Sequence, residues 1–166
     1  MLSAEYIIDY FGMKPLPEEG GFYVETYRAE EKIAAQHLPS RYAGPRNFST
    51  AILYLLTPDT CSRLHKVKSD EIFHFYLGDP VQMIQLHPNG KSEFVDIGPD
   101  ITKGQHPQII VPKGTWQGAR LKKNGKFALL GCTVAPGFEF ADYQPVDKEK
   151  LLIRYPNVSH IIAELA

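Results

Sequence analysis

Cysteine and net charge are both scarce in this chain, and each scarcity excludes a class of protein. The 166 residues contain only two cysteines, Cys61 and Cys132, too few for a disulfide framework and not spaced as a CxxC pair. We expect two free, buried thiols in a reducing compartment, the cytoplasm. A net charge of -1 gives no electrostatic reason to expect nucleic acid or an anionic membrane as partner.

Long apolar runs are missing as well. No run approaches the roughly 18 residues of a membrane span. The first residues, MLSAEYIIDYFG, lack the basic region and small-residue cleavage site of a signal peptide. The apolar fraction of 43% and the charged fraction of 22% are typical of a soluble globular protein. We therefore expect one domain, residues 1–166, with a sizeable core.

Helical patterns occur only near the two ends. Ser3 can cap a short helix that Gly12 ends, so we expect a helix over about residues 3–12. Asp147 can cap a second segment, and Pro156 interrupts it before a last amphipathic stretch. This pattern predicts helical structure over about residues 147–165.

The middle of the chain has the pattern of many short strands. Each boundary contains glycine, proline or asparagine, which favour tight turns. This punctuation indicates an antiparallel sandwich or barrel. Residues 29–48 lack a clear period, and we expect a long loop there. The expected strands include residues 21–28, 49–56, 71–77, 81–87, 92–97, 107–112, 116–121 and 127–134.

One stretch of ten residues holds a concentrated set of polar and aromatic side chains. Glu71, Phe73 and Phe75 alternate along one strand, so they share a face, with His74 opposite. A turn at residues 68–70 can bring His65 onto the same concave surface as Glu71. Apolar walls would raise the pKa of Glu71, and a neighbouring histidine would lower it. The two effects together can tune the pair for proton transfer.

A plainer interpretation of the same spacing stays open. Glu71 can form a surface salt bridge with Lys66 or Lys68. Farther along, Trp116 and Gln117 follow a Pro-Gly turn and begin a strand. A tryptophan beside an amide suits stacking and hydrogen bonding to a polar ligand, although a lone tryptophan is equally typical of a core.

Two motifs resemble the signature of the cupin superfamily. The first has His65, Lys66 and Val67, followed by Glu71 and Gly78, and the second runs from Pro112 through Gly114 to Gln117. Longer stretches, GGFYVETYR, SDEIFHFYLGDPVQMI and VPKGTWQGARL, resemble the cupin family once catalogued as a domain of unknown function and described as predicted sugar epimerases. The resemblance implies an all-β, antiparallel double-stranded β-helix, the RmlC-like jelly-roll barrel, with short terminal helices. It also implies a homodimer.

Three departures from the pattern concern the site. Metal-binding cupins offer two histidines from HxH, the glutamate and a last histidine, whereas this chain has Val67 and Gln117 at two of those positions. His65, Glu71 and Gln117 are too few good ligands for a tight transition-metal centre. We therefore expect no resident cofactor and at most weak divalent metal binding. The chain also has Pro-Glu-Glu-Gly-Gly at residues 17–21, where family members often have HPEGG.

The resemblance further suggests an epimerase-like or isomerase-like enzyme with a catalytic His65, Glu71 and tyrosine. His65 is the candidate base and Glu71 its orienting partner. Tyr76 is the candidate general acid, with Tyr23 and Tyr54 as alternatives. Two alternative functions stay open, a binding or sensing module without turnover and a metal-dependent enzyme such as a dioxygenase. The candidate ligand-binding residues are Phe73, His74, Phe75, Trp116, Gln117 and Arg46, with Arg120 as a further anion-binding candidate.

Overall fold

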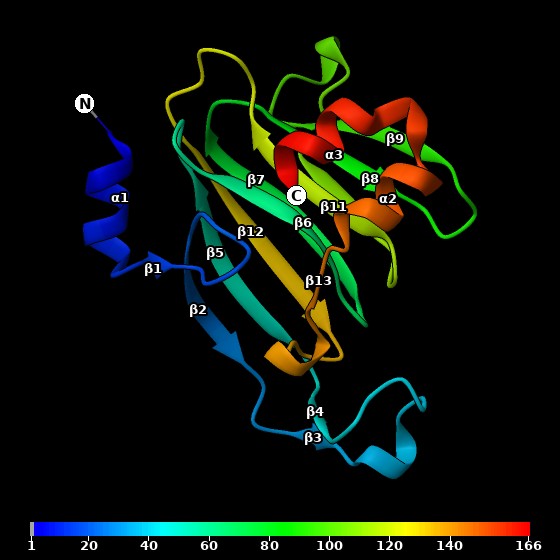
Figure 1. Cartoon of the computed structure of the whole chain (residues 1–166). Coiled ribbons are helices and arrows are strands. Elements are labelled where there is room, and N and C mark those ends of the chain that lie inside the picture. The colour runs from blue at the N-terminus through cyan, green and yellow to red at the C-terminus, as the bar shows by residue number, and fades with distance from the viewer. Residues whose placement is uncertain (1) are drawn as a thin grey trace.

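Two antiparallel β-sheets face each other in the computed structural model, which describes residues 2–166 (Figure 1). The large sheet has the strand order β1-β2-β5-β12-β7-β10 and the small sheet the order β13-β6-β11-β8-β9. This is the jelly-roll barrel that the sequence predicted. The strands of the large sheet are β1 (Lys14–Pro15), β2 (Phe22–Arg28), β5 (Thr50–Leu56), β12 (Ala128–Ala135), β7 (Asp70–Gly78) and β10 (Gln108–Val111). Those of the small sheet are β13 (Gln144–Pro145), β6 (Cys61–Lys66), β11 (Trp116–Leu121), β8 (Val81–Leu86) and β9 (Ser92–Ile97).

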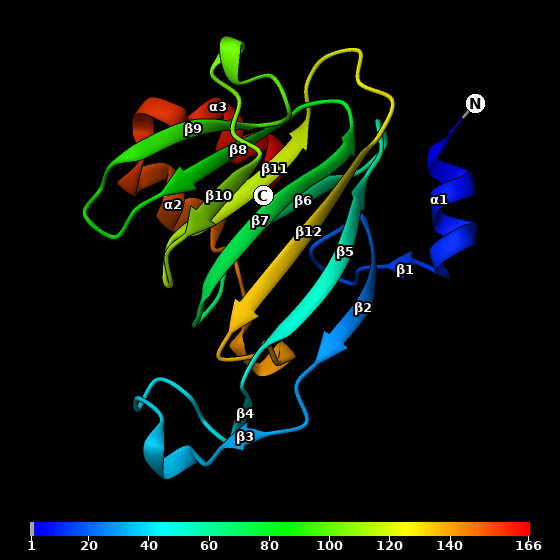
Figure 2. The ribbon, with the colours of Figure 1, turned by 180° about the vertical axis from the view of Figure 1, so that it is seen from behind.

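Short helices flank the sheets at both ends of the chain, as predicted. Helix α1 (Ala4–Phe11) begins after Ser3, whose hydroxyl accepts a hydrogen bond from the Tyr6 amide at 3.2 Å. It ends at Gly12, whose φ of 62° is left-handed. Asp147 caps α2 (Lys148–Arg154), and a 3-10 turn at Pro156–Val158 separates α2 from α3 (Ser159–Leu165). Figures 1 and 2 show α2 and α3 over the outer face of the small sheet.

The segment predicted as a long loop, residues 29–48, has more structure than expected. Strands β3 (Lys32–Ile33) and β4 (Arg46–Asn47) pair with each other at its two ends. A 3-10 turn, Ala35–His37, lies between them. Figure 1 shows this segment extending from one end of the barrel. Two further 3-10 turns occur at Ile101–Lys103 and Phe140–Asp142.

Three apolar clusters hold these layers together. The largest fills the space between the two sheets and includes Tyr54, Phe73 and Leu130. The second joins the small sheet to α2 and α3, and the third lies under α1. Burying polar side chains among them is costly unless they are paired, so the buried His65, Glu71 and other polar groups between the sheets need an explanation.

No helix among residues 2–166 has the length and apolar character needed to cross a membrane. Both cysteines are free thiols, and Cys132 is buried as predicted whereas Cys61 is half-buried.

Candidate functional site

A cavity of about 660 Å³ lies between the sheets. Its walls come mainly from β2, β5, β7 and β12 of the large sheet, together with the turn at residues 16–19 and the segment 138–145. Val67, just after β6, and Glu71 and Phe73 on β7 also line it. This volume is in the range of small-molecule sites in proteins.

Glu71 is the most unusual side chain in this wall. It is only 6% exposed, and no lysine or arginine pairs with it among the described residues. The Gln117 amide nitrogen donates a hydrogen bond to its Oε2, and the Cys132 thiol lies 3.6 Å from its Oε1. Burial raises the pKa of Glu71 to about 7, against the opposing effect of nearby His65, while Glu19 raises it further. Glu71 can therefore both give and take a proton near neutral pH.

His65 is fixed by its backbone surroundings. Its Nδ1 lies 2.7 Å from the carbonyl oxygen of Arg63. A carbonyl only accepts, so Nδ1 carries a proton and Nε2 is the ring nitrogen left to face other groups. Nε2 lies 3.7 Å from Oε2 of Glu19, and the ring stacks on Tyr143 with centroids 5.1 Å apart. The prediction that Glu71 orients His65 is corrected here, because the Arg63 carbonyl holds Nδ1.

Glu19 is a site residue that the sequence interpretation missed. It sits on the turn between β1 and β2, where its carbonyl accepts from the Arg63 amide at 2.7 Å and its Oε1 from the Ser62 hydroxyl at 3.1 Å. The next residue, Gly20, has a φ of 94°, and a Cβ there would lie 2.4 Å from the Cys61 carbonyl oxygen. The Gly-Gly pair thus lets this turn approach β6 closely. The sequence signal that could have identified Glu19 is an acidic residue directly before such a pair.

Strand β7 separates the predicted site residues onto two faces. Phe73 lines the cavity, and Phe75 packs against the core between the sheets. His74 and Tyr76 belong to the outer face instead. The ring of His74 contacts the Thr133 hydroxyl at 3.3 Å.

The roles proposed for His74 and Tyr76 therefore need correction. Tyr76 is 53% exposed and stacks on His74. A side chain on the outer face of the large sheet cannot reach a ligand between the sheets. Tyr23 and Tyr143 line the cavity, and Tyr54 lines it as well while its hydroxyl donates to the Gly20 carbonyl at 2.9 Å. Burial raises the pKa of Tyr143 to about 12, so this phenol keeps its proton at neutral pH.

The remaining candidates also lie away from the cavity, with one exception. Trp116 packs against the cluster under α2 and α3, and the ammonium group of Lys66 lies 4.6 Å from its ring centroid. The core-anchor alternative for Trp116 is thus the one the structure supports. Arg46 is buried in an ion pair with Asp142, and Arg120 pairs with Glu164. Gln117 is the exception only in that it is bound to Glu71 of the wall, since it is buried and does not itself line the cavity.

The donor set does not fit the four-ligand centre of the general cupin signature. Val67 occupies one ligand position and lines the cavity with a side chain that binds no metal. The Gln117 amide nitrogen is directed at Glu71, so this nitrogen occupies one carboxylate oxygen that a metal would need. Among residues 2–166, no three His, Cys, Asp or Glu side chains are grouped to hold a metal. We therefore derive no chemical step through a metal.

Comparisons with known proteins agree with this architecture. A hypothetical protein from Leishmania major has a structure with a TM-score of 0.87 at 28% identity, covering 99% of both chains. Protein SO0799 from Shewanella oneidensis also has a TM-score of 0.87, at 31% identity, covering 100% of this chain and 98% of that one. Oxalate decarboxylase from Bacillus subtilis is 17% identical with a TM-score of 0.54, over 94% of this chain and 38% of that one. At that identity the likeness concerns the fold alone.

Sequence comparison identifies the family. The uncharacterized protein YML079W from Saccharomyces cerevisiae is 31% identical in an alignment of 134 residues that covers 75% of this chain. The matched region spans 66% of the yeast protein's length. The sequence model described as "Cupin superfamily (DUF985)" matches residues 5–146, most of the chain. The chain therefore belongs to the DUF985 family of the cupin superfamily.

Proposed function

We propose that this cupin is a small-molecule enzyme that moves a proton at a carbon next to a carbonyl group, as a sugar epimerase or isomerase does. The observation that carries the proposal is the buried Glu71, whose pKa is raised to about 7 beside His65. General acids and bases work best when their pKa lies near the operating pH. A buried carboxyl group whose pKa lies near neutral pH also destabilises the fold, and such perturbed pKa values are typical of functional sites.

The geometry assigns separate roles to the two residues. His65 is 1% exposed and contacts Glu19 and Tyr143 of the cavity wall without lining the cavity itself. Its Nε2, the ring nitrogen that the Arg63 carbonyl does not hold, is the candidate base that removes the carbon-bound proton. Glu71, in its protonated form, is the candidate donor to the oxygen that becomes an enolate. A ketone α-proton is too weakly acidic for imidazole alone, so this stabilisation is essential. Tyr143 or Tyr23, both in the cavity wall, replaces Tyr76 as the candidate acid.

A binding or sensing role without turnover is the second candidate. The cavity is lined mainly by apolar and aromatic side chains with a few polar groups, and that composition is typical of binding sites in general. A metal-dependent reaction is less favoured. The Bacillus subtilis oxalate decarboxylase has Mn(II) centres, but Val67 and Gln117 stand at ligand positions here.

Deuterium uptake from heavy water distinguishes turnover from binding. Purified protein is incubated with a panel of keto sugars, and carbon-bound deuterium is followed by NMR. We expect His65→Ala to slow uptake by roughly 100-fold or more, the usual contribution of a general base. Glu71→Gln should also slow it strongly while leaving the fold intact. His160→Ala, in the exposed part of α3, is the matched control.

Two results contradict the proposal. Undiminished uptake in His65→Ala excludes His65 as the base. No uptake from any compound that binds the cavity favours the binding role instead.

We also propose a homodimer. Strand β10 is an edge strand of the large sheet, and its Ile110 is 58% exposed. Pairing would cover such an edge and its apolar side chains. Sedimentation velocity at micromolar concentration should give the mass of two chains, and a strictly monomeric profile would contradict this.

A further inference from the structure

Most of the charged side chains that line the cavity are acidic. Five glutamates line it, Glu18, Glu19, Glu25, Glu71 and Glu139. Arg28 is the one lysine or arginine among the described residues of its wall. Even with Glu71 protonated, the carboxylates outnumber the guanidinium group, so the potential inside favours a positively charged ligand.

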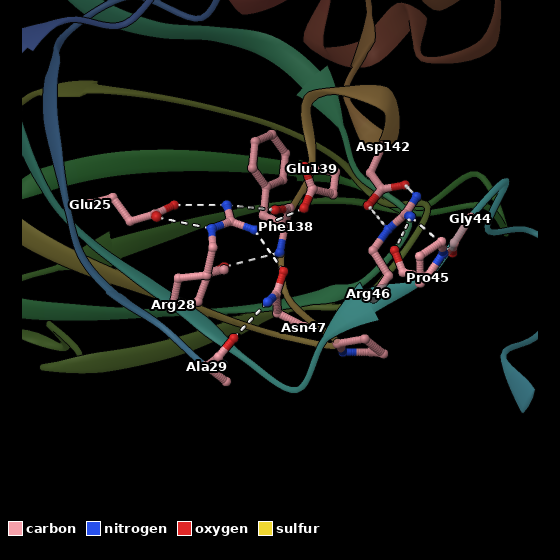
Figure 3. A network of polar contacts seen from close by, with 12 residues as sticks. Glu25, Arg28, Ala29, Gly44, Pro45, Arg46, Asn47, Phe138, Glu139 and Asp142 are labelled. Atoms are coloured by element: carbon pink, nitrogen blue, oxygen red, sulfur yellow. Dashed lines mark hydrogen bonds and ion pairs between the residues drawn. The ribbon is translucent and has the colours of Figure 1, made fainter. Parts of the chain in front are cut away.

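Arg28 is not available to bind an anion. Its guanidinium group has five N–H donors, and each has an acceptor within the protein (Figure 3). Glu25 accepts two of them at 2.9 and 2.8 Å, and Glu139 accepts one at 2.8 Å. The Asn47 side-chain oxygen and the Phe138 carbonyl accept the other two at 3.0 and 3.2 Å. A phosphate or carboxylate entering the cavity would therefore have to displace these bonds.

The innermost polar groups are mostly acceptors. Gln117 does not line the cavity but lies behind Glu71, with its amide nitrogen bound to that carboxyl group and its buried Oε1 without a hydrogen-bond partner within residues 2–166. Glu19 adds a carboxylate oxygen 3.7 Å from His65. Glu19 lines the cavity and its Oε2 can only accept while ionised, so this part of the wall is complementary to a ligand that brings N–H or O–H groups.

Aromatic rings complete the cavity wall. The face of an aromatic ring carries partial negative charge and attracts ammonium groups, most strongly where water is excluded. The carboxylates and the rings thus favour the same kind of ligand by two independent effects. The aromatic residues of the wall are Tyr23, Tyr54, Phe73, Phe138, Phe140 and Tyr143.

We infer that the ligand of this cavity is a small polar molecule carrying an ammonium group, such as an amino sugar, and not a phosphorylated or nucleotide-linked sugar. The inference rests on the proposed function only in taking this cavity as the ligand site. It narrows the substrate class, since an ammonium group near the reacting carbon also makes the neighbouring proton more acidic.

Three ring compounds that differ mainly in charge test this directly. Cyclohexylammonium, cyclohexanol and cyclohexanecarboxylate are titrated into the full chain at low ionic strength and neutral pH, with amide NMR signals of Phe73 and Cys132 as reporters. We expect the ammonium compound to bind roughly tenfold more tightly than the alcohol. The carboxylate should give no saturable shift. Added salt should weaken the binding of cyclohexylammonium and leave the binding of cyclohexanol unchanged.

A pair of charge variants locates the effect. Glu18→Gln removes one exposed carboxylate of the cavity wall. It should lower the affinity for cyclohexylammonium by roughly two- to fivefold. Glu149→Gln, on the exposed side of α2, is the matched control and should change nothing. Absence of ammonium binding, equal affinity for the three compounds, or preference for the carboxylate overturns the inference.

These binding measurements need no turnover. A failed deuterium exchange therefore leaves the ligand class standing, and a cavity that prefers anions leaves the proposed proton transfer standing.

Discussion

Two carboxylates are buried among residues 2–166, and they differ in what surrounds them. Asp142 is 2% exposed and Glu71 is 6% exposed. Both oxygens of Asp142 accept hydrogen bonds from the Arg46 guanidinium group, at 2.5 and 2.8 Å (Figure 3). Glu71 instead has an amide and a thiol as neighbours, which carry no positive charge.

This difference separates a structural carboxylate from a chemical one. The Arg46–Asp142 pair joins β4 to the segment 140–143 and so ties the long segment 29–48 to the barrel. Arg46 supplies a fixed positive charge to both oxygens of Asp142. Glu71 lacks one, so its proton stays exchangeable near neutrality. Burial alone therefore does not identify a functional carboxylate, whereas incomplete pairing within a cavity does.

Removing the cation from the paired carboxylate gives the largest expected effect. Arg46→Ala leaves Asp142 buried without a partner, and breaking a buried pair in this way costs about 3–5 kcal/mol of unfolding free energy. Urea denaturation at pH 7 measures the loss. Arg28→Ala, whose side chain is 34% exposed, is the control and should cost about 1 kcal/mol or less.

A double variant separates lost pairing from lost packing. Arg46→Met with Asp142→Leu removes both charges together, so we expect most of the stability to return. A double variant as unstable as Arg46→Ala would contradict the role given to the ion pair.

The unpaired carboxylate should reveal itself through pH. The pKa of Glu71 is raised from its ordinary 4.5 to about 7 by burial, so the folded state holds this proton more tightly than the unfolded state. Its contribution to stability is fully present below pH 4.5 and is lost as the pH rises through 7. A shift of this size corresponds to a loss of about 3 kcal/mol.

The variant Glu71→Gln cannot titrate and so isolates this contribution. Between pH 4.5 and 8, the unfolding free energy of the wild-type protein should fall by about 3 kcal/mol relative to that of the variant. The control Glu149→Gln should follow the wild-type protein across this range. Parallel curves for wild type and Glu71→Gln would show that the two states bind this proton equally.

Local patterns predicted the fold well. Turn residues and strand periods placed the eight expected strands to within a few residues, because each turn depends on side chains near it in sequence. The caps at Ser3 and Asp147 were found for the same reason. The short strands β3 and β4 were missed, since they pair with each other over only two residues each, and β4 is held by the long-range Arg46–Asp142 contact.

The site was predicted only in part. His65, Glu71, Phe73 and Gln117 were assigned to the site, because strand parity and motif spacing decide which face they share. Parity gave no guidance for residues on turns, so Glu19 was missed. Tyr76 was named although parity places it with His74 on the outer face, and Trp116 could not be assigned to one layer from sequence.

The last prediction gives Glu71 the cation that Asp142 already has. Val67 and Gln117 stand at the two positions where metal-binding cupins have histidine. In the structure Val67 lines the cavity and Gln117 contacts Glu71, so Val67→His with Gln117→His places two further imidazoles beside His65 and Glu71.

Four such ligands match a transition-metal site, whereas valine is no ligand and a neutral amide is a poor one. We therefore expect Zn²⁺ or Mn²⁺ affinity to rise by a factor on the order of ten or more over wild type, about 1.4 kcal/mol at the lower bound. Titration calorimetry measures it, with Val67→His alone as the intermediate case. The bound cation should also lower the pKa of Glu71, so its loss of stability between pH 4.5 and 8 should shrink when metal is present. Unchanged affinity in the double variant would show that His65 and Glu71 do not converge on one point, and proton transfer between them and one ligand would then be untenable.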